Sequence, residues 1–304
     1  MKKLKNKRKN NSIRFNESFW GYAFIIIPFL GMIIFTLIPF FMTIYSSLTS
    51  WPMGQALSDA KFIGLKNYAE AFKSDMFWKS LGNTFYYMLG IPIGLLLAVI
   101  FASLMNRDAA YEGTFRVIYY IPAICSTVAI SFVFQRLFSS DGGLINKLLM
   151  KLGVENPPIW MSDPRYTKWV IIIMNVWRGL GSSIIIYVSG MQAISNDLYE
   201  AAEIDGANKL QKFTNITVPL LRPVTFYLVV TGVINGAQMY VEPRLIFEGN
   251  GPVNSTFTTV MYLYDYAFAN SRAGYSSSIA IMLAIIVFGL TIVQFYINRR
   301  SRDA

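Results

Sequence analysis

Long apolar runs, uncharged except for Arg178 in the fourth, alternate with shorter polar segments along this chain. Six of the runs are long enough to cross the roughly 30 Å of hydrocarbon in a bilayer as a helix. They occupy about 20–48, 80–105, 117–135, 169–194, 224–241 and 276–298. The pattern therefore predicts an all-α polytopic membrane protein with six transmembrane helices.

Composition agrees with this prediction, and the charges orient the chain. Hydrophobic residues make up 54% and charged residues 14%, too apolar a balance for an ordinary soluble domain. Basic residues predominate in the tail before Trp20 (Lys2, Lys3, Lys5, Lys7, Arg8, Lys9 and Arg14 against Glu17) and after Asn298 (Arg299, Arg300 and Arg302 against Asp303). Six spans place both ends on one side, and the positive-inside rule makes that side the cytoplasm. Because a span follows the basic tail at once, we interpret the tail as a topology signal and expect no nucleic-acid partner.

The residues that most enzymes and metal sites need are missing. The chain has no histidine and only one cysteine, Cys125, which lies in the third apolar run. It also has no G-x-x-x-x-G-K-[ST] phosphate loop. We therefore expect neither catalytic residues, nor a metal site, nor a cofactor in this chain. Any energy input must come from a partner or from an ion gradient.

The sequence of the polar segment 195–223 is not typical of a solvated linker. Ser195 or Asn196 can cap a helix, alanines supply a small apolar face, and Gly206 interrupts it. Pro219 and Pro223 close the segment before the next span. We predict a compact helical loop on the cytoplasmic side that another protein binds.

This segment resembles the coupling loop of permeases from binding-protein-dependent ABC importers. Glu200-Ala201-Ala202, then Gly206 and Ile216-Thr217-Val218-Pro219, follow the family's spacing, with Val218 where leucine is usual. Tyr199–Ala207 also fits the longer form typical of the carbohydrate (maltose and glycerol-phosphate type) subgroup. The likeness extends over about Ser80–Arg299 and includes Phe115–Pro122, Gly143–Asn146, Trp160, Trp177–Gly179, Asn250–Pro252 (Asn250 replaces a usual glycine) and Asn254–Thr256.

The resemblance implies the type I ABC importer permease fold and a role for the loop. It implies a permease core at 80–299, preceded by a cytoplasmic tail (1–19) and a first transmembrane helix with its outer loop (20–79), and followed by a cytoplasmic tail (300–304). The coupling loop would dock on a separate ATPase through Glu200, Ala201, Ala202, Asp205, Gly206, Ala207 and Pro219. The implied partners are a homologous second permease, two ATP-binding subunits that hydrolyse the ATP, an extracytoplasmic solute-binding protein, a sugar and membrane lipid.

Polar residues inside the spans are candidates for the substrate pathway, because burying them in a membrane is costly. Thr231, Asn235, Gln238 and Glu242 are spaced to line one face of the fifth helix. Asn175 and Arg178 lie one turn apart in the fourth, with Glu242 a candidate partner for Arg178, and Tyr240 completes the set. Interhelical hydrogen bonds and ligand contact are both open for these side chains.

Together these features indicate one permease subunit of an ATP-driven importer in a bacterial cytoplasmic membrane. Its cargo would be a mono- or oligosaccharide or a polyol derivative. An importer permease for a non-sugar solute is the nearest alternative. An ion-coupled secondary transporter is a further one.

Overall fold

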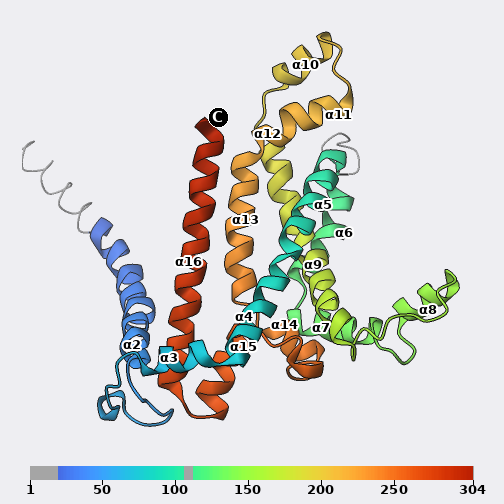
Figure 1. The fold of residues 1–304 in the computed structure, drawn as a ribbon. Coiled ribbons are helices and arrows are strands. Elements are labelled where there is room, and N and C mark those ends of the chain that lie inside the picture. Colours follow the sequence, from blue (N-terminus) through green and yellow to red (C-terminus); the bar gives the residue numbers. More distant parts are fainter. Residues whose placement is uncertain (1–19, 106–111, 304) are drawn as a thin grey trace, which may run out of the picture. The chain divides into compact units, whose positions relative to one another are not determined.

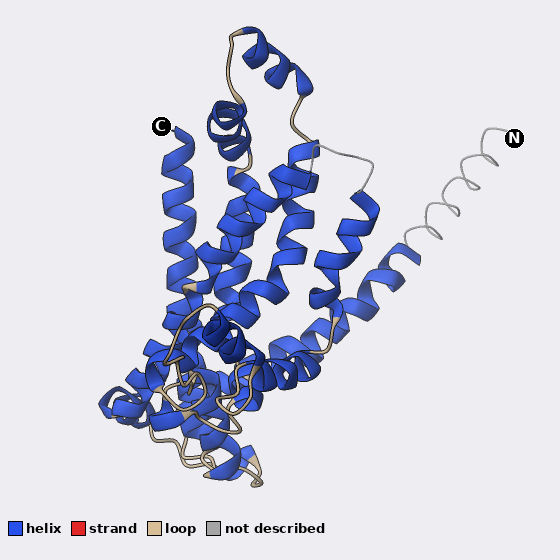
Figure 2. Cartoon of the chain, turned by 90° about the vertical axis from the view of Figure 1, so that its right-hand side faces the viewer, coloured by secondary structure: helices blue, strands red, loops and turns tan. Residues whose placement is uncertain are grey.

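The computed structural model describes residues 20–105 and 112–303. The predicted basic tail (1–19), residues 106–111 of the predicted cytoplasmic turn and Ala304 lie outside the described residues, as do the side chains of Phe115 and Arg116. Within the described part the chain is helical, apart from turns and one isolated β-bridge between Thr49 and Phe62 (Figures 1 and 2). The all-α prediction is thus confirmed.

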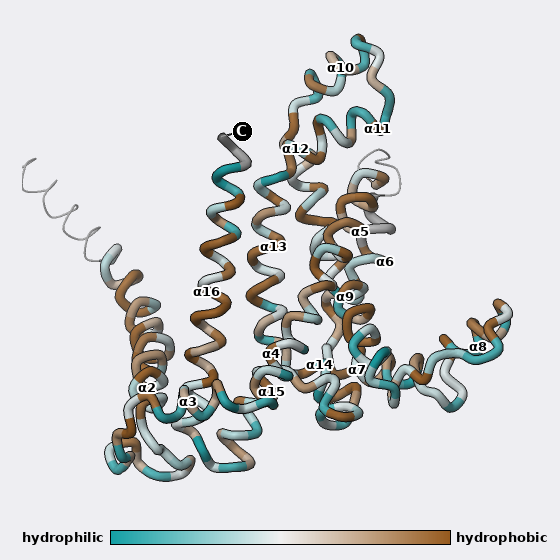
Figure 3. Tube along the Cα trace, viewed as in Figure 1, coloured by the Kyte–Doolittle hydropathy of each residue, from teal (hydrophilic) through white to brown (hydrophobic). Residues whose placement is uncertain are grey.

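The helices follow the apolar runs. The first span, Trp20–Ser47, contains a π-helical turn (Ile33–Leu37) and α2 (Ile38–Ser47). The others are α3 (Lys66–Lys73), α4 (Asp75–Met88), α5 (Gly90–Met105), α6 (Glu112–Ile124), α7 (Thr127–Leu137), α8 (Leu144–Lys151), α9 (Pro164–Gln192), α10 (Asn196–Ile204), α11 (Lys209–Lys212), α12 (Val218–Leu220), α13 (Arg222–Ala237), α14 (Val241–Ile246), α15 (Thr259–Tyr264) and α16 (Ala273–Asp303). Apolar residues predominate along the long helices and polar residues gather on α10 and α11 (Figure 3).

Four of the six predicted spans are continuous helices, and two are bent. The continuous ones are Trp20–Ser47, Asp75–Met105 (α4 and α5, joined at Leu89, whose backbone is in the α-helical region), Pro164–Gln192 and Ala273–Arg300. The third run is instead two helices, Val117–Ile124 and Thr127–Leu137, bent by 103°. The fifth, Arg222–Ala237, follows Lys209–Leu220 at a bend of 62°. The described residues therefore hold four helices able to span a membrane, or six if each bent pair counts as one.

The third predicted span is thus broken in the middle, and local chemistry together with packing explains the break. Pro122, inside α6, has no N–H to donate to the helix ladder. Ser126 then adopts an extended conformation (φ −57°, ψ 128°) before α7 begins. Beyond the break, Ile130 and Phe134 of α7 join a buried cluster with Ile246 of α14. Burial of this apolar face of α7 stabilises the bent conformation.

The chain divides into two compact units, each described by itself: residues up to Ala69 with Tyr266–Ile281, and Glu70–Asp265 with residues from Met282 onward. In the first unit, the buried Asn67 donates to the carbonyl oxygens of Ser47 and Thr49, both at 2.9 Å. Ser46 Oγ donates to Ser277 Oγ at 2.7 Å. These hydrogen bonds fix the turn that ends the first span.

In the second unit, α9 carries two hydrophobic clusters. Near its N-terminal end, Val170–Ile172 and Met174 pack with residues of α4, α7 and α14. Towards its C-terminal end, Ile184, Tyr187, Val188 and Met191 pack with α5 and α13. The middle of α9, between the clusters, is left to face a cavity.

Candidate functional site

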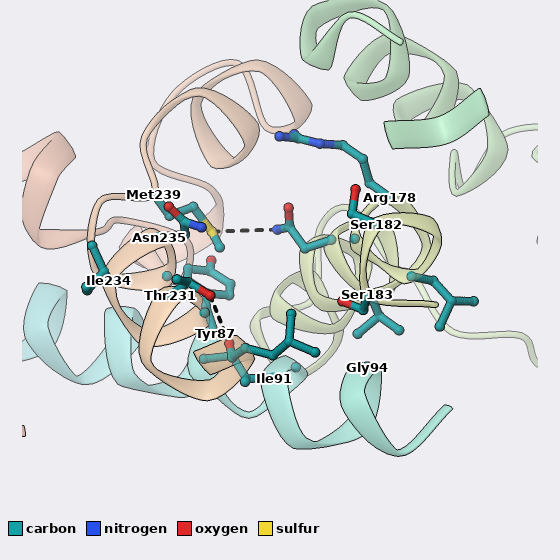
Figure 4. A pocket seen from close by; sticks show the side chains of 18 of the residues that line it. Tyr87, Ile91, Gly94, Arg178, Ser182, Ser183, Thr231, Ile234, Asn235 and Met239 are labelled. Carbon is teal, nitrogen blue, oxygen red and sulfur yellow. Dashed lines mark hydrogen bonds between the residues drawn. The ribbon is translucent and has the colours of Figure 1, made fainter. Parts of the chain in front are cut away.

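A cavity of about 910 Å³ lies in the second unit and is lined by residues of α4 to α7, α9, α13, α14 and the connection between the last two (Figure 4). Its floor is apolar, with Ile91 and Leu95 of α5. The polar groups come from α9 on one side and from α13 and the residues after it on the other. Polar and apolar walls in one concave site are typical of small-molecule binding.

The contribution of α9 comes from the stretch between its two hydrophobic clusters. Asn175, Arg178 and Ser182 recur at helical spacing and line the cavity, as does Ser183 (Figure 4). Asp163 caps the start of this helix by accepting from the Arg165 N–H at 2.9 Å, and Pro164 occupies its first turn. Ser182 and Ser183 were not among the sequence candidates. The four-residue step from Arg178 to Ser182 is the signal that could have found Ser182.

The facing wall is built by α13 and the turn that follows it. Thr231 Oγ1 donates to its own helix, at Tyr227 O (2.9 Å). The amide side chains of Asn235 and Gln238 are exposed to the cavity and make no hydrogen bond with another residue of the described chain. Both amides thus keep a donor and an acceptor for a ligand.

The sequence placed Gln238 and Glu242 on one continuous helix with Thr231 and Asn235, and this is wrong. Helix α13 ends at Ala237, and Gln238 leaves the helical conformation (φ −94°, ψ 9°). Met239 O accepts from Thr258 Oγ1 at 2.7 Å, which satisfies a carbonyl that the helix no longer uses. The chain then turns into α14, so Gln238, Tyr240 and Glu242 still reach the cavity, by a bend rather than by helical periodicity.

One ion pair crosses the cavity wall. Arg178 Nη1 donates to Glu242 Oε1 at 2.9 Å, which confirms Glu242 as the partner of Arg178. Asn175 Nδ2 lies 3.8 Å from the sulfur of Met239. The ring of Tyr240 packs against that of Tyr264, with centroids 5.0 Å apart.

A second candidate site is the segment 195–223, which follows α9. Ser195, rather than Asn196, caps α10 by accepting from the Asp197 N–H. At the other end the Gly206 N–H donates to Glu203 O and the Ala207 N–H to Ala202 O, at 3.0 and 2.8 Å. This is a Schellman cap, and Gly206 supplies its left-handed residue with φ +81°. Gly206 is thus required by the backbone conformation of the turn.

Side chains of this segment divide into internal ties and an exposed face. Tyr199 Oη lies 2.9 Å from Thr217 Oγ1, and Lys212 Nζ donates to Glu203 Oε2 at 2.9 Å. That hydrogen bond, with the lysine charge, lowers the pKa of Glu203 below its usual range. Glu200, Ala201 and Asp205 are exposed, Ala202 and Ala207 are half-buried, and Pro219 is half-buried in the first turn of α12.

Comparison with known proteins agrees with this geometry. The family model described as "Binding-protein-dependent transport system inner membrane component" matches residues 90–303. The probable ABC transporter permease protein YesP of Bacillus subtilis is 34% identical, over 95% of this chain and 93% of that protein. The lactose transport system permease protein LacF of Rhizobium radiobacter is 32% identical, over 93% and 95%. A permease chain in the crystal structure of a bacterial alginate ABC transporter, in complex with its alginate pentasaccharide-bound periplasmic protein, shares the fold, with a TM-score of 0.80 at 21% identity over 92% of this chain and 93% of that one.

Proposed function

The chain belongs to the family of inner membrane components of binding-protein-dependent transport systems, and we propose that it is one permease subunit of an ATP-driven sugar importer. The cavity between α9 and α13 is the observation that carries this proposal. We assign it to the translocation pathway. Asn175, Arg178, Asn235, Gln238, Tyr240 and Glu242 are the residues that would meet the solute.

The backbone around the cavity supports a hydrated pathway. Glu242 pairs with Arg178, which is the middle residue of α9 (Pro164–Gln192). The non-helical residues 238–240 therefore belong near the middle depth of a spanning helix. Irregular backbone is tolerated at that depth only where it is buried in protein or lines a water-filled cavity. Since Gln238, Met239 and Tyr240 line this cavity, the second condition fits.

The chemistry of the lining supports a hydroxyl-rich solute. Amides and hydroxyls that can both donate and accept, such as Asn235 and Gln238, match the alternating needs of sugar hydroxyl groups. The similar LacF protein is named for lactose transport. We propose a mono- or oligosaccharide or a polyol derivative as the cargo.

We further propose that α10 and the turn after it couple this subunit to an ATPase. Leu198 and Ile204 of α10 are exposed next to Glu200 and Asp205. Small residues at Ala201 and Ala202 permit close approach of a partner helix or groove. The full assembly would add a second permease, two ATP-binding subunits and a solute-binding protein outside the cell. Both termini of this chain would lie in the cytoplasm.

Replacement of Gly206 tests the coupling. A Cβ at position 206 would meet no atom within 4 Å, so in Gly206→Val the damage comes chiefly from the left-handed backbone. We expect ATP-dependent uptake in proteoliposomes to fall at least about tenfold, because a left-handed conformation costs a non-glycine residue about 1–2 kcal/mol and opens the cap.

Gly153 provides the matched control. It closes α8 with the same cap, has φ +91° and also has open space around its Cβ position. Gly153→Val should leave co-purification with the ATPase subunits unchanged. Wild-type uptake and ATPase association in Gly206→Val would refute the coupling role.

The sugar itself is tested separately. The solute-binding protein encoded in the same gene cluster is titrated with neutral sugars, and the tightest ligand is then offered to the reconstituted importer. We expect ATP-dependent accumulation of that sugar. A binding protein selective for amino acids or phosphonates would overturn the sugar assignment while leaving the permease assignment intact.

A further inference from the structure

Arg178 and Glu242 are the two charged residues among those that line the cavity in the described part of the chain. Their side chains are 30% and 13% exposed. A charge near the middle of a spanning helix is expensive unless it is paired or wet. The pair removes the net charge of the lining.

The pair is held by a single hydrogen bond. Only Arg178 Nη1 donates to Glu242 Oε1, and the guanidinium group makes no other hydrogen bond within the part of the chain that the structure describes. A guanidinium group has five N–H donors and never loses its charge in a protein. Most donors of Arg178 are therefore left for the cavity, where a buried structural pair would be expected to satisfy them on protein acceptors.

The neighbouring charges are already engaged elsewhere. Arg244, two residues after Glu242, lies 3.3 Å from Asp265 and donates to Asn250 Oδ1 at 3.1 Å. Glu242 is thus the counter-charge of Arg178 rather than part of a wider ionic network. Removal of its charge would leave a guanidinium facing the cavity without an anion.

We propose that the Arg178–Glu242 pair sets the charge selectivity of the pathway. This inference rests on the proposed function and adds a substrate class to it. Arg178 offers N–H donors to sugar hydroxyls. Glu242 neutralises the guanidinium charge, so the carboxylate of a solute cannot form an ion pair with it. The pathway therefore prefers uncharged sugars to uronates.

The test measures equilibrium binding to the purified permease–ATPase complex without the solute-binding protein. The probes are lactose as neutral disaccharide, digalacturonate as anionic disaccharide and chitobiose with free amines as cationic disaccharide. We expect the wild type to bind lactose in preference to digalacturonate. Glu242→Gln should gain on the order of tenfold in digalacturonate affinity, since a charge-assisted hydrogen bond becomes available. Arg178→Gln should instead gain affinity for the cationic disaccharide.

Two further variants make the result interpretable. The double variant Arg178→Gln/Glu242→Gln, which is neutral again, should lose both gains. Glu248→Gln removes an acid outside this cavity, where Glu248 accepts from Gln135 at 3.0 Å, and should change neither preference. Thermal melting of each complex identifies a variant that fails to fold. If either single variant fails, the other single variant decides, because it is expected to gain affinity for the disaccharide of opposite charge.

The outcomes separate this inference from the function on which it rests. An unchanged affinity for digalacturonate in a folded Glu242→Gln complex overturns the charge-selectivity role, even if the wild type imports a neutral sugar. A wild type that binds digalacturonate more tightly than lactose also overturns it. Failure of the wild-type importer to accumulate any sugar overturns the proposed function instead.

Discussion

Two short helices flank α9 and are built alike, yet we assign coupling to one of them only. Helix α8 precedes α9 and α10 follows it, and each ends in a Schellman cap closed by a glycine, Gly153 or Gly206. Each exposes large apolar residues, such as Leu148 of α8 and Ile204 of α10. Backbone geometry and apolar exposure therefore do not distinguish a coupling helix from another surface helix.

Charge and side-chain ties do distinguish the two helices. Helix α8 is basic through Lys147 and Lys151, and it is held by Asn146, which accepts from Trp160 Nε1 at 2.7 Å. Helix α10 is acidic through Asp197, Glu200 and Glu203 and is followed by the basic α11. Assignment of coupling to α10 therefore depends on the identity of its residues at the motif positions. Single substitutions at those positions can test it.

The largest loss of stability should come from a substitution in α9, because this helix connects α8 to α10. A Cβ on Gly181 would collide with the backbone oxygen of Tyr119 in α6. We expect Gly181→Ala to destabilise the protein by about 3 kcal/mol or more, since the clash is with backbone that cannot rotate away. Melting of the detergent-solubilised protein measures this, and α8 and α10 should lose protection from hydrogen exchange together.

Gly179 is the matched position on the same helix. A Cβ there meets nothing within 4 Å, so Gly179→Ala should be neutral or stabilise the helix by up to about 1 kcal/mol. Equal melting temperatures for the two alanine variants would contradict the close α6–α9 packing.

The second largest effect should be a loss of affinity for the ATPase that is caused by a substitution in α10 and not by one in α8. Ile204 is 87% exposed and Leu148 is 56% exposed. If α10 docks on the ATPase, Ile204→Ser should weaken that association about tenfold or more, since burial of such a side chain stabilises by about 1.5–3 kcal/mol. Leu148→Ser should leave the affinity for the ATPase unchanged. Equal losses from both variants, measured by biolayer interferometry on the purified subunits, would remove the distinction.

Sequence reasoning predicted the spans and the helical form of segment 195–223 because both depend on local patterns. The apolar runs predict where the helices lie, and Ser195 and Gly206 are capping residues whose roles depend on near neighbours. The end of α13 at Ala237 depends instead on a long-range contact, that of Thr258 with Met239. The break at Ser126 depends on such contacts too, those of α7 with α14, in addition to the local effect of Pro122. The Arg178–Glu242 pair was reachable because a lone cation inside a span requires a partner, whereas the free amides of Asn235 and Gln238 emerge only from the fold.

A smaller effect concerns the start of α10. Its N-cap Ser195 accepts from the Asp197 N–H, whereas the N-cap of α8 is Gly143, which has no side chain for this role. Ser195→Ala should cost α10 about 1 kcal/mol of helix stability, and Ser195→Gly only a few tenths. Hydrogen exchange of the α10 amides measures the difference, and identical exchange in the two variants would show that the cap contributes nothing.

The smallest effect is electrostatic and again sets the two helices apart. Lys212 lowers the pKa of Glu203, chiefly through their hydrogen bond, whereas Lys147 and Lys151 of α8 have no ion pair within the described chain. Because the pKa of Glu203 is lowered on folding, the contact stabilises the α10–α11 turn at neutral pH and is lost as the pH falls through that lowered pKa. Carbon-13 NMR of the labelled glutamate carboxylates should show Glu203 titrating at a higher pH in Lys212→Gln, and at its wild-type pH in Lys209→Gln. Since the Glu203 side chain is 76% exposed, the shift should shrink in high salt. A shift of equal size in Lys209→Gln would mean that the general positive charge of α11, rather than the Lys212 contact, sets the acidity of Glu203.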